Sequence, residues 1–442
     1  MSYARYESYS DSGLQWLGKI PSHWEVVQSR RLFEQRKERA RDGDEQLTAS
    51  QKYGIISQKK FMELENQRVV QVLTGSELLK HIEPNDFVIS MRSFQGGLEW
   101  SRQSGCVSSA YIGLIPIKHV VPEFYNYLFK CGPYIQALQS TSNLVRDGQA
   151  LRFENFSQVW LPIIPDDEQQ KIANFLDHET AKIDTLIDKQ QQLIRLLKEK
   201  RQAVISHAVT KGLNPNAPMR DSGVEWLGEV PEHWDITYIK HLSVVKRGAS
   251  PRPIDDPRYF DESGDYAWVR IADVSRAGMY LTATTQRLSN LGSSLSVKLE
   301  ADELFVSIAG TVGKPCITVS RACIHDGFVY FPELKINNKY LYYIFEAGEA
   351  YLGLGKMGTQ LNLNTETVGG IKIGLPPSSE IENIVFFIEK SNEKYDFLIN
   401  KADEFIKLMQ ERRTALISAA VTGKIDVRDW QVPALMQNKE AV

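Results

Sequence analysis

Residue types and spacings that could support catalysis occur at few places in this sequence, and none of them completes a catalytic motif. Residues 310–314 (GTVGK) resemble a phosphate-binding loop, but two residues separate the glycines where that motif needs four. Pro315 also stands where the motif needs a Ser or Thr to hold Mg²⁺. Residues 214–217 (NPNA) lack the aromatic side chain with which an amino-methyltransferase would stack on a flipped base. The sequence therefore argues against ATPase or methyltransferase chemistry in this chain.

Acidic residues and histidines are better explained by structure than by catalysis. Asp166, Asp167, Glu168 and Lys171 have the types of a nuclease cluster, but they lie at the expected start of a long helix, where negative charge suits the helix dipole. The histidines at positions 23 and 233 invite a catalytic interpretation, but no catalytic arrangement of acid and nucleophile accompanies them. The 4 cysteines show no CxxC spacing, so we expect buried thiols and no zinc site or disulfide framework.

The composition predicts two or three globular domains with large cores. The chain has 442 residues, 42% of them hydrophobic, and a formal net charge of −3. That charge does not exclude nucleic-acid binding, because a local basic face is enough. The first ten residues lack an apolar signal core, and no apolar run is long enough to span a bilayer. We expect a soluble, cytoplasmic protein.

Two long amphipathic helices must position any functional site. Residues 165–212 repeat apolar side chains at seven-residue steps, and residues 377–425 repeat them in the same register. This pattern predicts helices that pair, and each copy has the other as its partner. A helix of this length would extend roughly 65 Å, and duplication predicts an antiparallel pair. The predicted seam consists of Leu176, Ile183, Leu197, Val204, Ile388, Tyr395, Met409 and Leu416, with Ile172, Leu186 and Leu193 at intervening positions.

A second repeat precedes each globular segment, so the chain is a tandem duplication. Residues 11–24 (DSGLQWLGKIPSHW) return as residues 221–234 (DSGVEWLGEVPEHW). We interpret this motif as a structural clasp. The segments between this motif and each long helix match only weakly. We call these segments the inserts, and we call each copy of the motif with its long helix a frame. The sequence therefore predicts two similar frames that hold two different inserts.

Apolar runs predict the order of elements within each insert. Strands are expected at 86–93 and 107–117, followed by a helix from Pro122. In the second half, strands are expected at 303–309 and 327–332, followed by a helix from Asn337. Residues 159–165 and 371–377 predict a strand that closes each insert and leads into a long helix.

Two basic stretches lie in the first half. Residues 30–41 predict a charged helix, either a solvated face or a phosphate contact. Residues 53–61 predict a strand and turn with Lys59 and Lys60 at the tip.

This arrangement resembles the DNA-specificity (S) subunits of type I restriction-modification systems over essentially the whole chain. Residues 162–176 look like the family's P-x-x-EQ-x-x-I-x-x-(F)L helix opening. In the second half, Glu380-Ile381 replaces Glu-Gln and Phe387-Ile388 replaces Phe-Leu, and residues 395–399 restore the match. The SGxxWLGxxPxHW segment before each insert also looks typical of the family.

The resemblance implies an α+β fold with two globular mixed α/β target-recognition domains and two long antiparallel coiled-coil helices related by pseudo-twofold symmetry. The division is a first recognition domain with its clasp (1–164), the first helix (165–212), a linker (213–218), the second recognition domain (219–376), the second helix (377–425) and a loosely ordered tail (426–442).

The resemblance also implies a noncatalytic function. Each recognition domain would read one half of a bipartite DNA sequence. The helices would fix the spacer between the half-sites and dock two methyltransferase (M) subunits for adenine-N6 methylation, with restriction (R) subunits in the full complex. S-adenosylmethionine, ATP and Mg²⁺ would belong to those partners, and this chain would hold no cofactor or metal.

Loops that follow the paired strands are the best candidates for DNA contact, since Arg and Lys bind phosphates and Arg, Asn, Gln, Ser and Thr can bind base edges. In the first domain the candidates are Lys59, Lys60, Arg92, Ser93, Gln95, Arg146, Gln149 and Arg152. In the second domain they are Arg247, Arg252, Arg270, Thr311, Lys314, Lys356, Thr359 and Gln360.

Two alternatives stay open at this point. The chain could be an enzyme with unrecognised motifs, which would then turn over alone. It could also be a coiled-coil assembly adaptor whose globular domains bind protein and not DNA.

Overall fold

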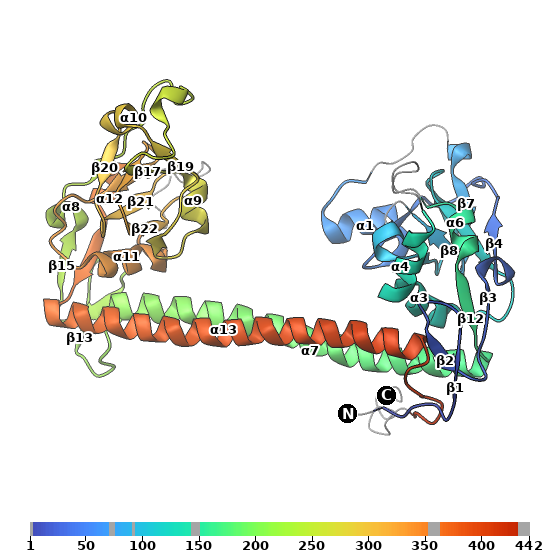
Figure 1. Ribbon diagram of the computed structural model, residues 1–442. Helices are drawn as coiled ribbons and strands as arrows, with labels where there is room; N and C mark the ends of the chain where they lie inside the picture. The colour runs from blue at the N-terminus through green and yellow to red at the C-terminus, as the bar shows by residue number, and fades with distance from the viewer. Residues whose placement is uncertain (1–2, 70–75, 91–92, 143–150, 352–362, 432–442) are drawn as a thin grey trace. The chain divides into compact units, whose positions relative to one another are not determined.

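The structure of the chain is a computed structural model that describes residues 3–69, 76–90, 93–142, 151–351 and 363–431. The chain divides into two compact units: unit 1 contains residues 1–190 and 404–442, and unit 2 contains residues 191–403 (Figure 1). Both boundaries fall inside the long helices α7 (Asp166–Lys211) and α13 (Ser378–Val421). Each unit therefore includes one stretch of each long helix, whereas the sequence-based division set the helices apart from the domains.

Unit 1 contains a four-stranded antiparallel sheet in the order β4-β11-β8-β9. Two strand pairs, β5–β6 and β7–β10, lie beside it, and a parallel bridge from Gln46 to Cys106 joins them. The strands are β1 (Tyr9–Asp11), β2 (Lys19–Pro21), β3 (Glu25–Gln28), β4 (Phe33–Arg36), β5 (Leu47–Ser50), β6 (Gly54–Ser57), β7 (Lys80–Ile82), β8 (Phe87–Ile89), β9 (Glu99–Trp100), β10 (Gly105–Val107), β11 (Ile112–Pro116) and β12 (Trp160–Ile163). The helices before α7 are α1 (Gln58–Glu65), α2 (Ser93–Gly96), α3 (Pro122–Lys130), α4 (Gly132–Ser140) and α6 (Phe153–Gln158).

Unit 2 contains a five-stranded sheet in the order β16-β24-β21-β22-β18 and a four-stranded sheet in the order β19-β17-β23-β20. The strands are β13 (Met219–Asp221), β14 (Glu229–Pro231), β15 (Asp235–Tyr238), β16 (Lys246–Arg247), β17 (Tyr266–Val269), β18 (Tyr280–Leu281), β19 (Gln286–Leu288), β20 (Val297–Leu299), β21 (Leu304–Ser307), β22 (Pro315–Thr318), β23 (Ala322–Ile324), β24 (Phe328–Tyr330) and β25 (Lys372–Leu375). The helices are α8 (Ile239–Leu242), α9 (Ile271–Arg276), α10 (Asn290–Ser294), α11 (Asn338–Ala347) and α12 (Thr365–Gly369).

The inserts share one topology although their sequences differ. The order β4-β11-β8-β9 in unit 1 corresponds to β16-β24-β21-β22 in unit 2. The parallel bridge between the β5 and β10 segments corresponds to the parallel pair β17–β23, with β6 and β7 matched by β19 and β20. Unit 2 adds α9 and β18 between β17 and β19. The expectation of inserts that differ in sequence and keep the same order of elements is therefore confirmed, and the structure adds the matching strand order of their sheets.

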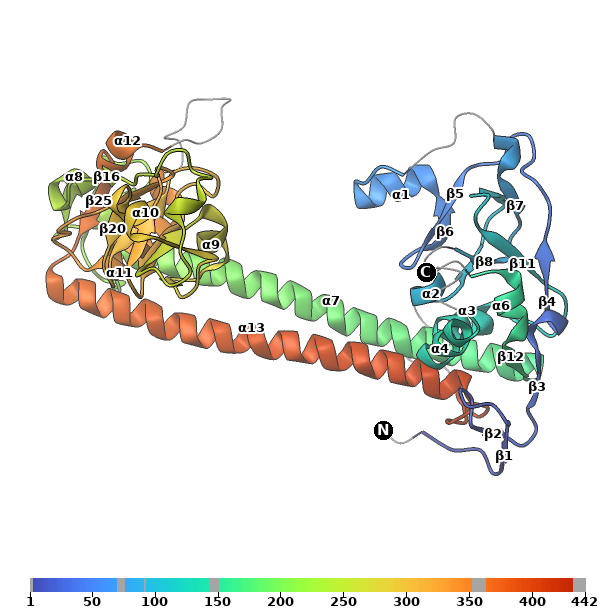
Figure 2. The ribbon, with the colours of Figure 1, turned by 45° about the horizontal axis from the view of Figure 1, so that its top comes forward.

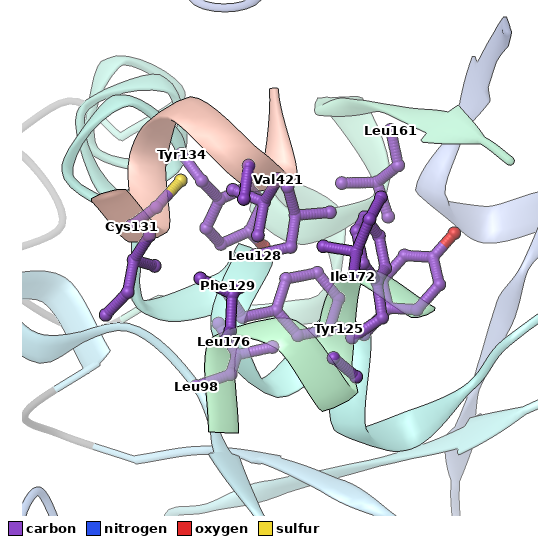
Figure 3. Packing of buried hydrophobic residues seen from close by; sticks show 14 of the residues in the cluster. Leu98, Tyr125, Leu128, Phe129, Cys131, Tyr134, Leu161, Ile172, Leu176 and Val421 are labelled. Carbon is purple, nitrogen blue, oxygen red and sulfur yellow. The ribbon is translucent and has the colours of Figure 1, made fainter. Parts of the chain in front are cut away.

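Packing against the long helices holds each insert to its frame. In unit 1, Ile172 and Leu176 of α7 and Val421 of α13 pack with Tyr125 and Leu128 of α3, and all of them are fully buried (Figure 3). In unit 2, the equivalent helix α11 packs its buried aromatic residues in one core with the start of α13 and the end of α7. The predicted helices after Pro122 and Asn337 are thus confirmed.

Within each unit, α7 and α13 lie side by side as predicted. In unit 1 the Arg413 Nε atom donates to the Asp184 Oδ1 atom at 2.9 Å, and in unit 2 the Arg201 Nη1 atom donates to the Asp396 Oδ1 atom at 2.8 Å. Early α7 therefore contacts late α13 in unit 1, and late α7 contacts early α13 in unit 2, as in an antiparallel pair. Of the predicted seam, Leu176, Ile183, Ile388, Met409 and Leu416 are buried, and Leu197, Val204 and Tyr395 are half-buried.

A clasp joins the N-terminal repeat to the start of each long helix. In unit 1 the carboxylate of Glu168 accepts hydrogen bonds from the Tyr6 hydroxyl (2.7 Å) and the Trp24 indole (3.1 Å) and pairs with His23 Nε2 at 2.8 Å. In unit 2 Glu380 makes the corresponding contacts with His233 (2.7 Å) and Trp234 (3.2 Å). The structural interpretation of the motif is supported, and an acid is present that the sequence spacing did not reveal.

Several local expectations are wrong. The stretch 30–41 contains β4 and no α-helix, because Arg36 turns inward to bond Asp86 at 2.5 and 3.0 Å. Lys59 and Lys60 lie on helix α1 and not on a turn. Leu186 and Leu193 are each 42% exposed, so they do not fill the seam.

The segment after Asp426 is also more ordered than expected, as far as residue 431. Val427 is buried, and the Trp430 ring lies 5.5 Å from that of Phe175.

Candidate nucleic-acid interface

In each unit the fold brings the same two loops together. One loop follows the strand β5 or its equivalent β17, and the other follows β8 or its equivalent β21. Each pair of loops lies beyond strand ends, where side chains are free to face a ligand. The site is therefore repeated in topology while its residues differ.

In unit 1, Gln51 of the β5–β6 turn covers the end of α2. A Cβ atom at Gly96 would lie 2.1 Å from the Gln51 Nε2 atom. Gln51 and Gln95 are both exposed, so two amide side chains lie on neighbouring loops. Amides of this kind can pair with adenine edges in the major groove. Gln95 was expected from the sequence, whereas Gln51 was missed because nothing in the sequence links it to residue 96.

Exposed cations surround this pair of loops. Lys59 and Lys60 are exposed on α1, which directly follows β6. In the described part of the chain, no carboxylate forms an ion pair with either of them, since Glu65 of the same helix is taken by Lys52 and Tyr53. Arg102 is also exposed, and its guanidinium stacks 4.5 Å from the centroid of the Trp100 ring. Arg102 follows Ser101, which forms a β-bridge with Ile55 of β6. Arg102 therefore lies next to the strand that leads into α1.

In unit 2, the added helix α9 lies against the loop after β21. The Ser275 hydroxyl bonds the Thr311 hydroxyl at 2.8 Å, and Lys314 Nζ donates to the Ser275 carbonyl at 3.4 Å. Arg270 immediately precedes α9 and donates to the side chain of Gln286. The predicted residues Arg270, Thr311 and Lys314 are thus brought together around one short helix.

A second group in unit 2 surrounds Asp326. Its carboxylate accepts hydrogen bonds from the Ser250 hydroxyl (2.9 Å) and Arg252 Nη2 (3.0 Å), and its carbonyl accepts from Arg247 Nε (2.5 Å). Burial raises the pKa of Asp326, but the Ser250 hydrogen bond and the Arg252 charge outweigh it, so the pKa is lowered overall. Burial lowers the pKa of the adjacent His325, and the charges of Arg247 and Arg270 lower it further against the opposing effect of Asp326. The cluster therefore presents oriented guanidinium groups beside a neutral imidazole.

The remaining predicted residues divide into three sets. Ser93 was expected to contact DNA, but it is fully buried and its hydroxyl accepts from the Ser90 backbone N–H at 2.8 Å, so its side chain is not exposed to a ligand in this structure. Arg152 is exposed at the start of α6. The residues that lie outside the described part of the structure are Arg92, Arg146, Gln149, Lys356, Thr359 and Gln360.

Neither a metal centre nor a membrane span is found among the described residues. Among them, no group of three or more His, Cys, Asp or Glu side chains is arranged to hold a metal ion. None of the described helices combines the length and the apolar character required of a membrane span.

Comparisons with known proteins agree with this architecture. The family described as type I restriction modification DNA specificity domain matches residues 21–195 and again residues 231–404. The type I restriction enzyme StySPI specificity subunit of Salmonella potsdam is 23% identical over 394 residues, which cover 81% of this chain and 79% of that protein.

Two solved structures share the fold. One was determined in work on complex assembly and conformational transition of the type I R-M system; its TM-score is 0.68 at 15% identity, over 91% of this chain and 98% of that chain. The other is the HsdS subunit from Thermoanaerobacter tengcongensis, with a TM-score of 0.55 at 15% identity, over 92% of this chain and 98% of that chain.

Proposed function

This chain belongs to the type I restriction modification DNA specificity family, and we propose that each of its two units reads one half of a bipartite DNA sequence. As a specificity subunit it would supply sequence selection and no chemistry. S-adenosylmethionine, ATP and Mg²⁺ would be bound by methyltransferase and restriction subunits that assemble on it.

The observation that carries this proposal is the repeated pair of loops. In unit 1 the loop after β5 contacts the loop after β8, and in unit 2 the segment after β17 contacts the loop after β21. The polar side chains at these contacts are amides in unit 1, and a hydroxyl, a lysine and an arginine in unit 2. A shared scaffold with different polar side chains is what two different half-sites require, because base edges are distinguished by their donor and acceptor patterns. Exposed cations around the loops would supply the sequence-independent attraction to phosphates.

The paired helices support the second part of the proposal. Exposed apolar side chains on α13 of unit 2 include Phe386 (61%) and Phe397 (61%), and α7 of unit 1 exposes Leu186 (42%). Exposed apolar surface of this kind marks sites of protein association. We propose that the helices dock two methyltransferase subunits and fix the spacer between the half-sites.

The proposal is tested by selecting DNA from a random library with the chain in complex with its methyltransferase subunits. We expect one asymmetric motif made of two short half-sites and a nonspecific spacer of fixed length. Binding should weaken steeply with salt. A complex that assembles but enriches no motif would favour the alternative function, an assembly adaptor whose units bind protein.

A further inference from the structure

Each unit carries two adjacent exposed basic residues at the same place in its frame, outside the loops described above. In unit 1, β3 ends at Gln28 and leads into a short turn that contains Arg30 and Arg31; in unit 2, β15 ends at Tyr238 and leads into α8. Residues 21–33 and 231–243 share the same pattern of buried, half-buried and exposed side chains at every position. The exposed pair is Arg30 and Arg31 in unit 1 and Lys240 and His241 in unit 2.

In unit 2 an aromatic ring lies beside the cations, and in unit 1 a tryptophan lies on the strand that pairs with β3. Gln28 pairs across the strands with Trp160, whose side chain is 39% exposed, and Tyr238 pairs with Lys372 in the same register. In unit 2 the ammonium groups of Lys240 and Lys372 lie 4.9 and 5.3 Å from the centroid of the Tyr238 ring. Aromatic faces attract cations, which restricts the lysine side chains. We call each group a frame patch: Gln28, Arg30, Arg31 and Trp160 in unit 1, and Tyr238, Lys240, His241 and Lys372 in unit 2.

The positive charge of the frame patches is not neutralised within the protein. Across the described ranges, no carboxylate forms an ion pair with Arg30, Arg31, Lys240 or Lys372, whereas nearby arginines of the inserts such as Arg36 are paired with Asp or Glu. Unpaired cations that gather on a surface favour an anionic ligand.

Each frame patch is continuous with the end of the insert. The Ser29 hydroxyl bonds the carbonyl of Phe156 in α6, and α6 begins just after the exposed Arg152. In unit 2, α12 packs on α8 (Figure 2). A Cβ atom at Gly369 of α12 would lie 3.4 Å from the Lys240 Cβ atom. In unit 1, α6 therefore links the frame patch to Arg152, a residue that was predicted to contact DNA.

We propose that both frame patches bind phosphate groups of the DNA backbone, independently of sequence. The inference rests on the proposed function and adds to it a second kind of DNA contact, one that does not depend on the base sequence. The patches repeat at equivalent frame positions while the loops differ, so their ligand must be the same at both half-sites. The phosphate backbone has that property, and contacts to it orient a protein on the duplex without reading bases.

The test measures DNA affinity against salt for the complex of the chain with its methyltransferase subunits. The variants are Arg30→Gln with Arg31→Gln, and Lys240→Gln with Lys372→Gln. The control is Lys19→Gln with Lys424→Gln, which removes two exposed charges of unit 1 outside the paired loops, the frame patches and the long helices. Each lost phosphate contact should reduce the slope of log affinity against log salt by about 0.9 and weaken binding about fivefold at ~0.15 M salt.

For each patch variant we expect a slope reduced by about 2, affinity lowered by a factor of ten or more for target and random DNA alike, and an unchanged selected sequence. The control should keep the wild-type slope. The proposal is overturned if the slope stays the same, or if only target binding falls, since that would indicate base reading. It is also overturned if the variants lose their methyltransferase subunits, which would identify an acidic protein surface as the ligand. If the proposed function itself were wrong, the wild-type complex would show no sequence preference. That result is distinct from every outcome that overturns the frame-patch proposal alone.

Discussion

Glu168 shows how one buried carboxylate can organise an N-terminal motif. It is 3% exposed and accepts hydrogen bonds from residues about 145 to 160 positions earlier in the chain, Tyr6 and Trp24. Burial and the bond to Glu168 raise the pKa of Tyr6. The residue types of the clasp could be read from the repeat, but its acid could not, because capping alone accounts for acidic residues at a helix start.

The first prediction compares the two clasps. Glu168→Ala should destabilise unit 1 by about 3 kcal/mol, since it leaves buried donors without an acceptor. Glu380→Ala should cost roughly half as much in unit 2, because the Glu380 side chain is 25% exposed and contacts two partners, His233 and Trp234. Urea unfolding followed by site-specific probes in each unit measures both effects. Equal losses in the two units would contradict the account of Glu168.

The second prediction concerns pH. His81 is buried between Asp44 and Glu83, at 2.8 and 2.9 Å. Desolvation lowers its pKa, but the hydrogen bonds to Glu83 and Asp44 outweigh this effect, so the pKa is raised. A raised pKa in the folded state gives stability that is fully present below the unfolded value of about 6.5 and is lost as pH rises through the folded value.

His81→Asn should therefore destabilise unit 1 most at pH 6, and the difference from the wild type should shrink as pH rises. Thermal unfolding at a series of pH values measures this difference. The exposed His207→Asn is the control and should show no such trend. A difference that stays constant with pH would show that His81 is not charged in the folded protein.

At the scale of elements, the helices were the most predictable part of the chain and the basic stretches the least. A seven-residue apolar repeat survives in the structure because each predicted seam position is buried or half-buried, against the partner helix or an insert. The stretch 30–41 failed as a helix because a single long-range pair, Arg36 with Asp86, fixes it as a strand. The shared order of elements could be expected from the apolar runs, whereas the strand order within each sheet could not, since strands need only alternating apolar residues and many sequences satisfy them.

The third prediction compares a buried seam residue with an exposed apolar residue on the same helix. Ile183 is 5% exposed and Leu186 is 42% exposed, three residues apart on α7. Ile183→Ala should lower the free energy of unfolding by about 2–4 kcal/mol, and Leu186→Ala should change it by less than about 0.5 kcal/mol. Equilibrium unfolding of the isolated chain measures both. If Leu186→Ala proves as costly as Ile183→Ala, the helix pairing described for unit 1 is wrong.

Leu186 has a different expected role, because exposed apolar side chains on the helices are proposed to dock methyltransferase subunits. Its substitution should weaken assembly more than folding.

The candidate loop residues could be chosen from the sequence only by residue type. The structure then shows which of them the fold brings together: Gln95, Arg270, Thr311 and Lys314 lie on the paired loops, whereas Ser93 does not reach the surface.

At the scale of the whole molecule, duplication explains why one chain could recognise an asymmetric DNA sequence. Each unit repeats the clasp, the helix pairing, the sheet order and the frame patch, while the loop side chains differ. A protein built this way would bind phosphates in the same manner at both half-sites and bases differently at each. Under the proposed function, the same repetition would provide two equivalent places for a methyltransferase subunit.

The central claim is that two units of one chain read two halves of one sequence. Its most direct test is to co-express the chain with its methyltransferase subunit and to map N6-methyladenine across the DNA of that cell. We predict a single split motif with a spacer of fixed length and one methylated adenine in each half. An unmethylated genome from a complex that demonstrably forms, or methylation at a single continuous motif, would contradict the claim.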